Sequence, residues 1–245
     1  MKINGRLGNH LFQIATAYAL SKQTNQAFVM VYYDGLATDK EYIPYFPELK
    51  FTTNIPGNIR MYSESRPGVS CFIFNEHLKN MCSNDDILFN GWFQTEKYFK
   101  EYLPDLKKMF LKRQVKETDG YFIHIRRGDY VNDARYDLCN IDYYILSLRH
   151  FPKDATFYIL SDDINYCKSL EVFQNLQNKE FPVLDTLDTL HFMAGCRGGI
   201  CANSSFSWWG AYLGKREIIT MPRKWINNGM DTRDVYPENS ILIDF

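Results

Sequence analysis

A histidine, two arginines and an aspartate fall within six positions at the end of one short apolar segment. Tyr121–Ile125 is rich in aromatic and β-branched residues, which predicts a buried strand. His124 lies inside this strand, and two arginines and Asp129 follow it closely. Gly128 breaks the apolar run, so the charged residues lie where the strand ends. In open α/β sheets that edge is where ligands bind.

The two arginines of this segment are expected to have different roles. Because side chains alternate along a strand, His124 and Arg126 point to one side and Arg127 to the other. Two adjacent guanidinium groups repel each other, so an anionic ligand such as a phosphate is a natural partner. The structural alternative is an ion pair between Asp129 and one arginine. Such a pair with Arg127 would leave Arg126 free for the ligand.

Three predicted helix starts carry polar groups. The glycine turn Gly5–Asn9, which contains Arg6, precedes one helix, and Asn203–Ser205 precede another. Backbone N–H groups at a helix start can bind phosphate, but a tight turn or a capping side chain explains the same residues. At the third start, Ser161 is followed by two aspartates, and there capping is the favoured interpretation.

The composition limits the class of protein. The chain has 245 residues, 45% of them apolar, which is enough for one large or two small packed domains. A net charge of −1 with interspersed signs argues against a nucleic-acid partner. The six cysteines lack C-x-x-C pairs and metal-ligand spacing, which favours free thiols in a reducing compartment. Neither a signal peptide nor a bilayer-spanning stretch is evident, so we expect a cytoplasmic protein without a membrane span.

Alternating patterns predict an α/β fold with parallel sheets and helices on both faces. Strands are expected at 1–3, 28–33, 86–90, 121–125, 156–161, 181–184, 199–202 and 218–221. Helices are expected at 10–23, 95–112, 141–149, 163–176, 187–195 and 205–213. The charged stretch 112–119 separates the two halves, which suggests one domain over residues 1–115 and a second over 116–245.

Five segments in this order resemble the α-1,2-fucosyltransferases of the bacterial and viral type. The segments are GRLGNHLFQIATAYAL at 5–20, FNGWFQTEKYF at 89–99, HIRRGDYV at 124–131, FYILSDD at 157–163 and NSSFSWWGAYL at 203–213. HxRRxD also recurs in other GDP-fucose-dependent enzymes. The resemblance implies a GT-B-type enzyme, in which two Rossmann-like domains with parallel sheets face a nucleotide-sugar cleft. The N-terminal domain would take the acceptor and the C-terminal domain the GDP-sugar.

The resemblance also implies roles for individual residues. Arg126 should contact the β-phosphate of GDP-fucose, and His124 the nucleotide. The other residues expected to bind this donor are Ser204, Ser205 and Phe206 at the diphosphate and Arg6, Gly8 and Asn9 from the N-terminal half. Related enzymes read guanine with an acid at the position of Thr189. Here Asp188 stands beside it, so either residue is a candidate guanine contact.

The predicted function is transfer of fucose from GDP-fucose to a glycan hydroxyl, O-2 of galactose, with inversion at the anomeric carbon. Arg126 would be the catalytic residue because it stabilises the charge that grows on the β-phosphate. Asp34, Glu96 and Asp129 are candidates for the base. The alternatives are transfer of another sugar or linkage from a GDP-sugar, or a non-catalytic glycan- or nucleotide-binding protein on the same fold.

No cofactor or metal is expected. The chain has no D-x-D triplet, the spacing with which many sugar-nucleotide enzymes hold a divalent cation on a diphosphate. Asp162-Asp163 and Asp85-Asp86 are adjacent pairs, whose members point to opposite faces of a regular strand. Arginine and helix-start N–H groups can neutralise a diphosphate without metal.

Overall fold

The computed structural model describes residues 1–245 except 33–39, 56, 65–71 and 83–85. The chain forms two compact units. The N-terminal unit contains Met1–Phe110 and Met230–Tyr236, and the C-terminal unit contains Leu111–Gly229 and Pro237–Phe245. The division expected from the sequence lies between residues 115 and 116, without a return of the chain to the first unit.

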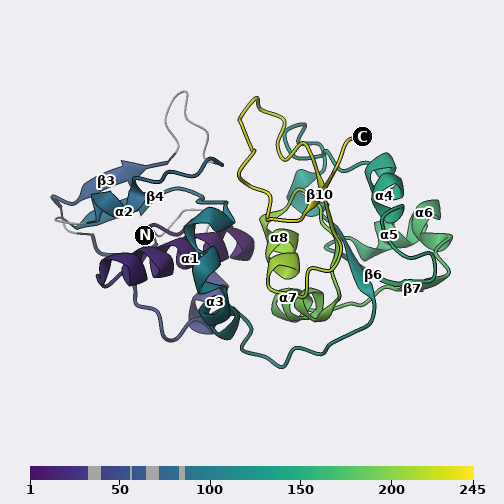
Figure 1. The fold of residues 1–245 in the computed structure, drawn as a ribbon, viewed down its shortest axis with the longest axis horizontal. Coiled ribbons are helices and arrows are strands. Elements are labelled where there is room, and N and C mark those ends of the chain that lie inside the picture. Colours follow the sequence, from purple (N-terminus) through teal and green to yellow (C-terminus); the bar gives the residue numbers. More distant parts are fainter. Residues whose placement is uncertain (33–39, 56, 65–71, 83–85) are drawn as a thin grey trace. The chain divides into compact units, whose positions relative to one another are not determined.

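A six-stranded, entirely parallel sheet is the centre of the C-terminal unit as described (Figure 1). Its strands are β5 (Tyr121–Ile125), β6 (Thr156–Ser161), β7 (Asn178–Glu180), β8 (Gly199–Ile200), β9 (Ile219–Pro222) and β10 (Ile241–Ile243). They lie in the order β10-β9-β8-β5-β6-β7. The chain therefore runs outward from β5 to β7, returns to place β8 on the other side of β5, and then runs outward again. The α/β class with parallel pairing is confirmed.

Four of the helices of this unit begin at polar capping residues. The helices of the unit are α4 (Ile141–Leu148), α5 (Ile164–Ser169), α6 (Glu171–Gln174), α7 (Thr186–Gly195) and α8 (Ser205–Tyr212), with a short 3-10 helix η4 (Gly128–Tyr130). Asn140, Asp163, Asp185 and Ser204, the caps of α4, α5, α7 and α8, each accept a hydrogen bond from a backbone N–H of the first turn. Such caps satisfy donors that the helix itself leaves unpaired.

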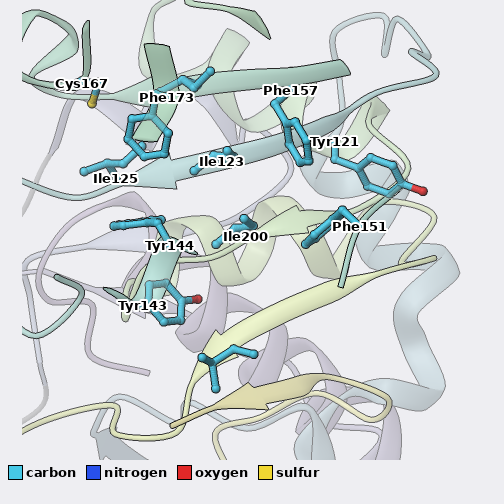
Figure 2. Close-up of a cluster of buried hydrophobic side chains, with 12 residues drawn as sticks. Tyr121, Ile123, Ile125, Tyr143, Tyr144, Phe151, Phe157, Cys167, Phe173 and Ile200 are labelled. Atoms are coloured by element: carbon cyan, nitrogen blue, oxygen red, sulfur yellow. The ribbon is translucent and has the colours of Figure 1, made fainter. Parts of the chain in front are cut away.

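A cluster of buried apolar side chains packs one face of β5 and its neighbours (Figure 2). Every residue of β5 is buried, as expected for the inner strand of a parallel sheet covered on both faces. Tyr143 of α4 donates its hydroxyl proton to the carbonyl of Cys201 at 2.5 Å, so this buried hydroxyl is satisfied. The cluster fixes the end of β5, from which the charged segment emerges.

The N-terminal unit combines a long helix with two short parallel strand pairs. Its elements are α1 (Leu7–Thr24), β1 (Met30–Val31), η1 (Lys40–Tyr45), β2 (Phe51–Thr52), β3 (Arg60–Ser63), α2 (Leu78–Met81), β4 (Ile87–Asn90), η2 (Glu96–Tyr98), η3 (Lys100–Tyr102) and α3 (Leu103–Phe110). β1 pairs with β2 and β3 with β4. The amide of Lys2 donates to Phe89 (2.7 Å) and that of Ile3 to Val31 (2.8 Å), so the first residues join both pairs.

Several predicted elements were wrong in extent. The helix predicted at 95–112 is two 3-10 turns followed by α3, because Pro104 has no amide hydrogen and is tolerated only in the first turn of a helix. The helix predicted at 163–176 is interrupted at Leu170, whose backbone is extended. The strand predicted at 181–184 lies earlier, as β7, and β10 was missed. The segment 1–3 forms a single bridge rather than a strand.

Candidate active site

The carboxyl ends of β5 and β8 meet at the point where the strand order reverses. In open parallel sheets this topological switch point is where ligands bind. Ile123 of β5 is in register with Ile200 of β8, so the loops that follow both strands leave the same edge of the sheet. One loop carries Arg126, and the other leads through Asn203 into α8. The structure thus brings together the two segments, around Arg126 and Asn203–Ser205, in which the sequence predicts anion-binding groups.

Arg126 is held between two carboxylates. Its Nη1 donates to Oδ2 of Asp162 at 2.5 Å, and its Nη2 donates to Asp129. The Arg126 side chain is 15% exposed, and those of Asp162 and Asp129 are 29% and 50% exposed, so water reaches the pair with Asp129 more easily than the pair with Asp162. The expectation that Asp129 would pair with Arg127 and leave Arg126 free was wrong. The reason is that η4 turns the chain back, which brings Asp129 to the side of the strand on which Arg126 lies.

Asp162 organises the turn after β5 with both carboxylate oxygens. Its Oδ1 accepts the backbone N–H of Arg127 at 2.8 Å, while Oδ2 binds Arg126. Gly128 has a φ of 27°, and a Cβ there would lie 2.6 Å from Oδ2 of Asp162. Glycine is therefore required for this close approach. Capping was favoured for the Ser161–Asp163 segment, but the cap of α5 is Asp163, and Ser161 instead accepts the amide of Asp163 at 2.9 Å.

Arg127 points away from this site, as strand alternation predicted. Its guanidinium carbon lies 3.7 Å from the centre of the Tyr166 ring, and its Nε is 3.9 Å from Asp163. Both partners belong to α5 or its cap, on the face of the sheet that carries the buried apolar cluster. Arg127 therefore holds α5 against the end of β5 through a cation–π contact.

His124 is buried on the side of Arg126. Its ring centre is 5.7 Å from that of Phe206 in the first turn of α8. Burial, followed by the charge of Arg126, lowers the pKa of His124 to about 3, so the ring is neutral near pH 7. Its Nδ1 has no hydrogen-bond partner among the described residues. A neutral ring with an unpaired nitrogen can still accept or donate one hydrogen bond to a ligand.

The start of α8 combines a side-chain cap with backbone donors. Ser204 accepts the amide of Phe206 at 3.3 Å and is buried, while Ser205 opens the helix. The structure therefore assigns Ser204 a capping contact. Trp208 and Trp209 are fully buried and stack in one aromatic group with Tyr212, so they belong to the core.

The two candidate guanine contacts lie in the first turn of α7. Nη1 of Arg113 lies 2.5 Å from Asp188 and 3.1 Å from Asp185, so one arginine bridges two acids. The hydroxyl of Thr189 donates to the carbonyl of Asp185 at 2.7 Å. Asp188 and Thr189 thus have intramolecular partners, and a role in reading guanine stays a prediction for both.

The N-terminal candidates surround the glycine turn that opens α1. Arg6 is the residue before the helix, Gly8 is buried in its first turn, and Asn9 accepts a hydrogen bond from the side chain of Gln94 at 2.8 Å. Gly5 has a φ of 77°, and a Cβ there would be 2.5 Å from the Asn9 amide nitrogen, so the turn needs this glycine. Donor contacts by these residues stay a prediction.

The three candidate bases differ in their surroundings. Asp34 lies outside the described residues. Glu96 is buried in η2, and half of the Asp129 side chain is exposed beside Arg126. Among the described residues no group of three or more His, Cys, Asp or Glu is arranged to hold a metal ion.

Glu64 is a buried carboxyl group that the sequence did not reveal. It follows β3, at the carboxyl end of a parallel strand pair, and is 3% exposed. Its Oε2 accepts the amides of Trp92 (2.7 Å) and Phe93 (2.8 Å), in the turn that also carries Gln94. Its Oε1 is buried without a partner among the described residues. Glu64 lies in a stretch of weak periodicity, where no local pattern indicates burial.

Burial raises the pKa of Glu64 to about 7, although the two amides that it accepts act in the opposite direction. The neighbouring ionisable group is Tyr98, whose pKa is raised by burial and further by the charge of Glu64. A buried carboxyl group with a raised pKa at the carboxyl edge of parallel strands has the properties of a functional group. It therefore joins the candidates for proton transfer.

Comparison with known proteins identifies the family. The sequence profile of glycosyl transferase family 11 matches residues 106–241, more than half of the chain. The chain belongs to this family. It is accordingly a glycosyltransferase of the fucosyltransferase-like kind, as the resemblance of its motifs predicted.

Individual relatives extend the comparison. An α-1,2-colitosyltransferase of Escherichia coli is 29% identical over 99% of this chain and 98% of its own length. A galactoside 2-α-L-fucosyltransferase of Caenorhabditis elegans is 26% identical over 54% of this chain and 43% of its own length. A crystal structure of NodZ α-1,6-fucosyltransferase soaked with GDP-fucose aligns with 87% of this chain and along 91% of its own length, with 10% identity and a TM-score of 0.46. Among the described residues no helix is long and apolar enough to cross a membrane.

The raised pKa of Glu64 predicts a pH dependence of stability. A folded-state pKa of about 7, against an ordinary value of 4.5, means that the folded state binds this proton more tightly than the unfolded state. The resulting stability is complete below pH 4.5 and is lost as the pH rises through 7. At about 1.4 kcal/mol per pKa unit, the loss is about 3 kcal/mol. In Glu64→Gln this component should vanish, which denaturant unfolding between pH 5 and 8 would measure.

The matched control is Glu101→Gln, which removes an exposed glutamate from the same unit. This variant should keep the wild-type dependence of unfolding free energy on pH. A Glu64→Gln protein that keeps the same dependence would contradict the assignment.

Proposed function

We propose that this protein transfers fucose from GDP-fucose to a glycan hydroxyl, O-2 of a galactose, with inversion at the anomeric carbon. The observation that supports this most directly is the position of Arg126. In a chain of glycosyl transferase family 11, it lies at the topological switch point, on the loop next to the one that leads into α8. A guanidinium fork and helix-start amides are the groups that suit a diphosphate.

The bond changes explain why Arg126 would matter. The bond between the anomeric carbon and the diphosphate oxygen breaks, and its electron pair remains on the β-phosphate. A guanidinium group placed there stabilises this charge more in the transition state than in the ground state. Arg126 is paired with Asp129 and Asp162, so a bound diphosphate would replace a carboxylate at one or both nitrogens. The carboxylates thus hold the fork in place before the donor binds.

The remaining bond forms on the opposite face of the sugar. The acceptor oxygen attacks the anomeric carbon while its proton passes to a base, and attack from that face inverts the configuration. Asp34, Glu96 and Asp129 stay candidates for this base. Glu64 is added because burial brings the pKa of its carboxyl group close to neutral, where a general base is most effective.

Colitose transfer is the second candidate function. It is favoured by the match to an α-1,2-colitosyltransferase along nearly the whole length of both chains. Colitose is fucose without its 3-hydroxyl group. A site that hydrogen-bonds this hydroxyl rejects the sugar that lacks it far more strongly than an apolar site rejects an added hydroxyl. Discrimination between the two donors therefore reports how the 3-position is bound.

The purified protein should convert GDP-fucose and a galactose-terminated glycan into GDP and an α-1,2-linked product. Nuclear magnetic resonance of the product identifies both the linkage and the anomeric configuration. GDP-colitose, tested in parallel on the same acceptors, is the competing donor. A higher kcat/KM with GDP-colitose would replace the fucose assignment, and turnover of neither donor with any galactoside would reject both.

Arg126→Ala should reduce transfer by about a hundredfold or more, the usual loss when a preorganised charged donor is removed. Arg126→Lys should stay severely impaired, because one ammonium group cannot reproduce a two-pronged guanidinium. Arg127→Ala is the control, since it should lower the melting temperature while GDP affinity is kept. Near-normal turnover by folded Arg126→Ala would remove Arg126 from the mechanism.

Transfer should continue without a divalent cation. Asp162 is engaged by Arg126 and the Arg127 amide, and Asp163 caps α5, so this acidic pair already has partners. Charge on the diphosphate would be neutralised by Arg126 and the amides of α8. Activity is to be measured after exhaustive EDTA treatment and again after addition of Mg²⁺ or Mn²⁺. If EDTA stops turnover and metal restores it, the prediction is wrong.

A further inference from the structure

Asn203 directs all of its side-chain hydrogen bonds to the protein itself. Its Nδ2 donates to the carbonyls of Tyr136 (3.0 Å) and Trp225 (3.1 Å), and its Oδ1 accepts from the thiol of Cys139 at 3.4 Å. The residue is 3% exposed. An amide with both protons donated and its oxygen occupied has little capacity left for a ligand. Asn203 therefore fastens the loop after β5 to the loop after β8.

Tyr130 makes a second connection across the same switch point. Its hydroxyl donates to the backbone carbonyl of Asn203 at 3.2 Å, one residue before the cap of α8. Burial raises the pKa of Tyr130 well above its usual value, so this hydroxyl stays protonated and remains a donor. The β5 loop and the α8 start are thus joined through one side chain.

The same ring also lies against Arg126. The guanidinium carbon of Arg126 is 5.5 Å from the ring centre of Tyr130, within the range of a cation–π contact. The ring also stacks on that of Tyr136, with centres 5.0 Å apart and planes 28° from parallel. Tyr130 therefore contacts the arginine on one loop and the backbone that precedes the helix on the other.

We propose that Tyr130 is a positioning residue that sets the distance between Arg126 and the first turn of α8. This inference rests on the proposed function, in which both elements bind one diphosphate. Arg126 and Ser204 are far apart in the chain, so their spacing depends on contacts between the two loops. A misplacement of about 1 Å can reduce a rate by about a hundredfold, so such a contact has a functional consequence.

The ring has a further effect when the donor binds. Arg126 must exchange Asp129 or Asp162 for phosphate oxygens, and during the exchange it loses ion-pair contacts. The face of Tyr130 gives the guanidinium a contact that does not depend on which anion is bound. The hydroxyl therefore fixes the spacing of the two loops, and the ring fixes the plane of the fork.

The test uses the ratio of GMP to GDP dissociation constants, measured by calorimetry on the full chain. In wild type GDP should bind more tightly, because Arg126 and α8 converge on the β-phosphate. Tyr130→Phe keeps the ring but loses the hydrogen bond, so GDP should bind about two- to tenfold more weakly, the effect of one such bond. GMP affinity should not change, and the ratio should fall. Tyr130→Leu should lower the ratio further.

Tyr136→Phe is the matched control. The hydroxyl of Tyr136 has no hydrogen-bond partner among the described residues, while its ring and carbonyl would be kept. This variant should show the wild-type ratio. A purely structural role for Tyr130 would lower the melting temperature of Tyr130→Phe but leave the ratio unchanged, and that result would overturn the proposal. If Tyr130→Leu fails to fold, Tyr130→Phe decides alone.

If the proposed function itself is wrong, the ratios of the variants will follow a different pattern. Arg126→Ala should abolish most of the preference for GDP over GMP. If it does so while Tyr130→Phe keeps the wild-type ratio, Tyr130 has no positioning role and the diphosphate site stands. If Arg126→Ala itself keeps the wild-type ratio, Arg126 does not bind the β-phosphate, and the proposal for Tyr130 falls with that assignment.

Discussion

The ion pairs of Arg126 with Asp162 and Asp129 are the constraint on which the candidate site depends. A guanidinium group that is mostly withdrawn from water needs partners for its charge, and these two carboxylates supply them. Asp162 also accepts the Arg127 amide, so the charge that satisfies the side chain fixes the backbone of the turn as well. The same residue requires glycine at 128. One carboxylate therefore sets both the direction of the arginine and the course of the chain.

The parallel sheet gives this arrangement its place. Because the chain returns from β7 to set β8 beside β5, two loops with complementary groups leave adjacent strands at the same edge. Neither loop alone would make a diphosphate site. The arginine offers charge without helix amides, and α8 offers amides without a cation.

In the N-terminal unit, the carboxyl group of Glu64 has surroundings that differ from those of Asp162. Glu64 accepts two backbone amides but leaves one oxygen unpaired, and burial keeps its pKa near neutral. Asp162, by comparison, pairs with the guanidinium group of Arg126. Retaining a poorly satisfied carboxyl group in a core costs stability, which is a common feature of functional groups.

The sequence by itself determined what depends on neighbours along the chain. The β5 and β6 strands, the start of α8 and the opposite directions of Arg126 and Arg127 follow from apolar runs, the polar residues Asn203–Ser205 and strand alternation. Tertiary structure decided the rest. The pairing of Asp162 with Arg126, the burial of Glu64 and the role of Asn203 join residues far apart in the chain. Which distant residues meet depends on the order of the strands in the sheet, and no local sequence pattern encodes this order.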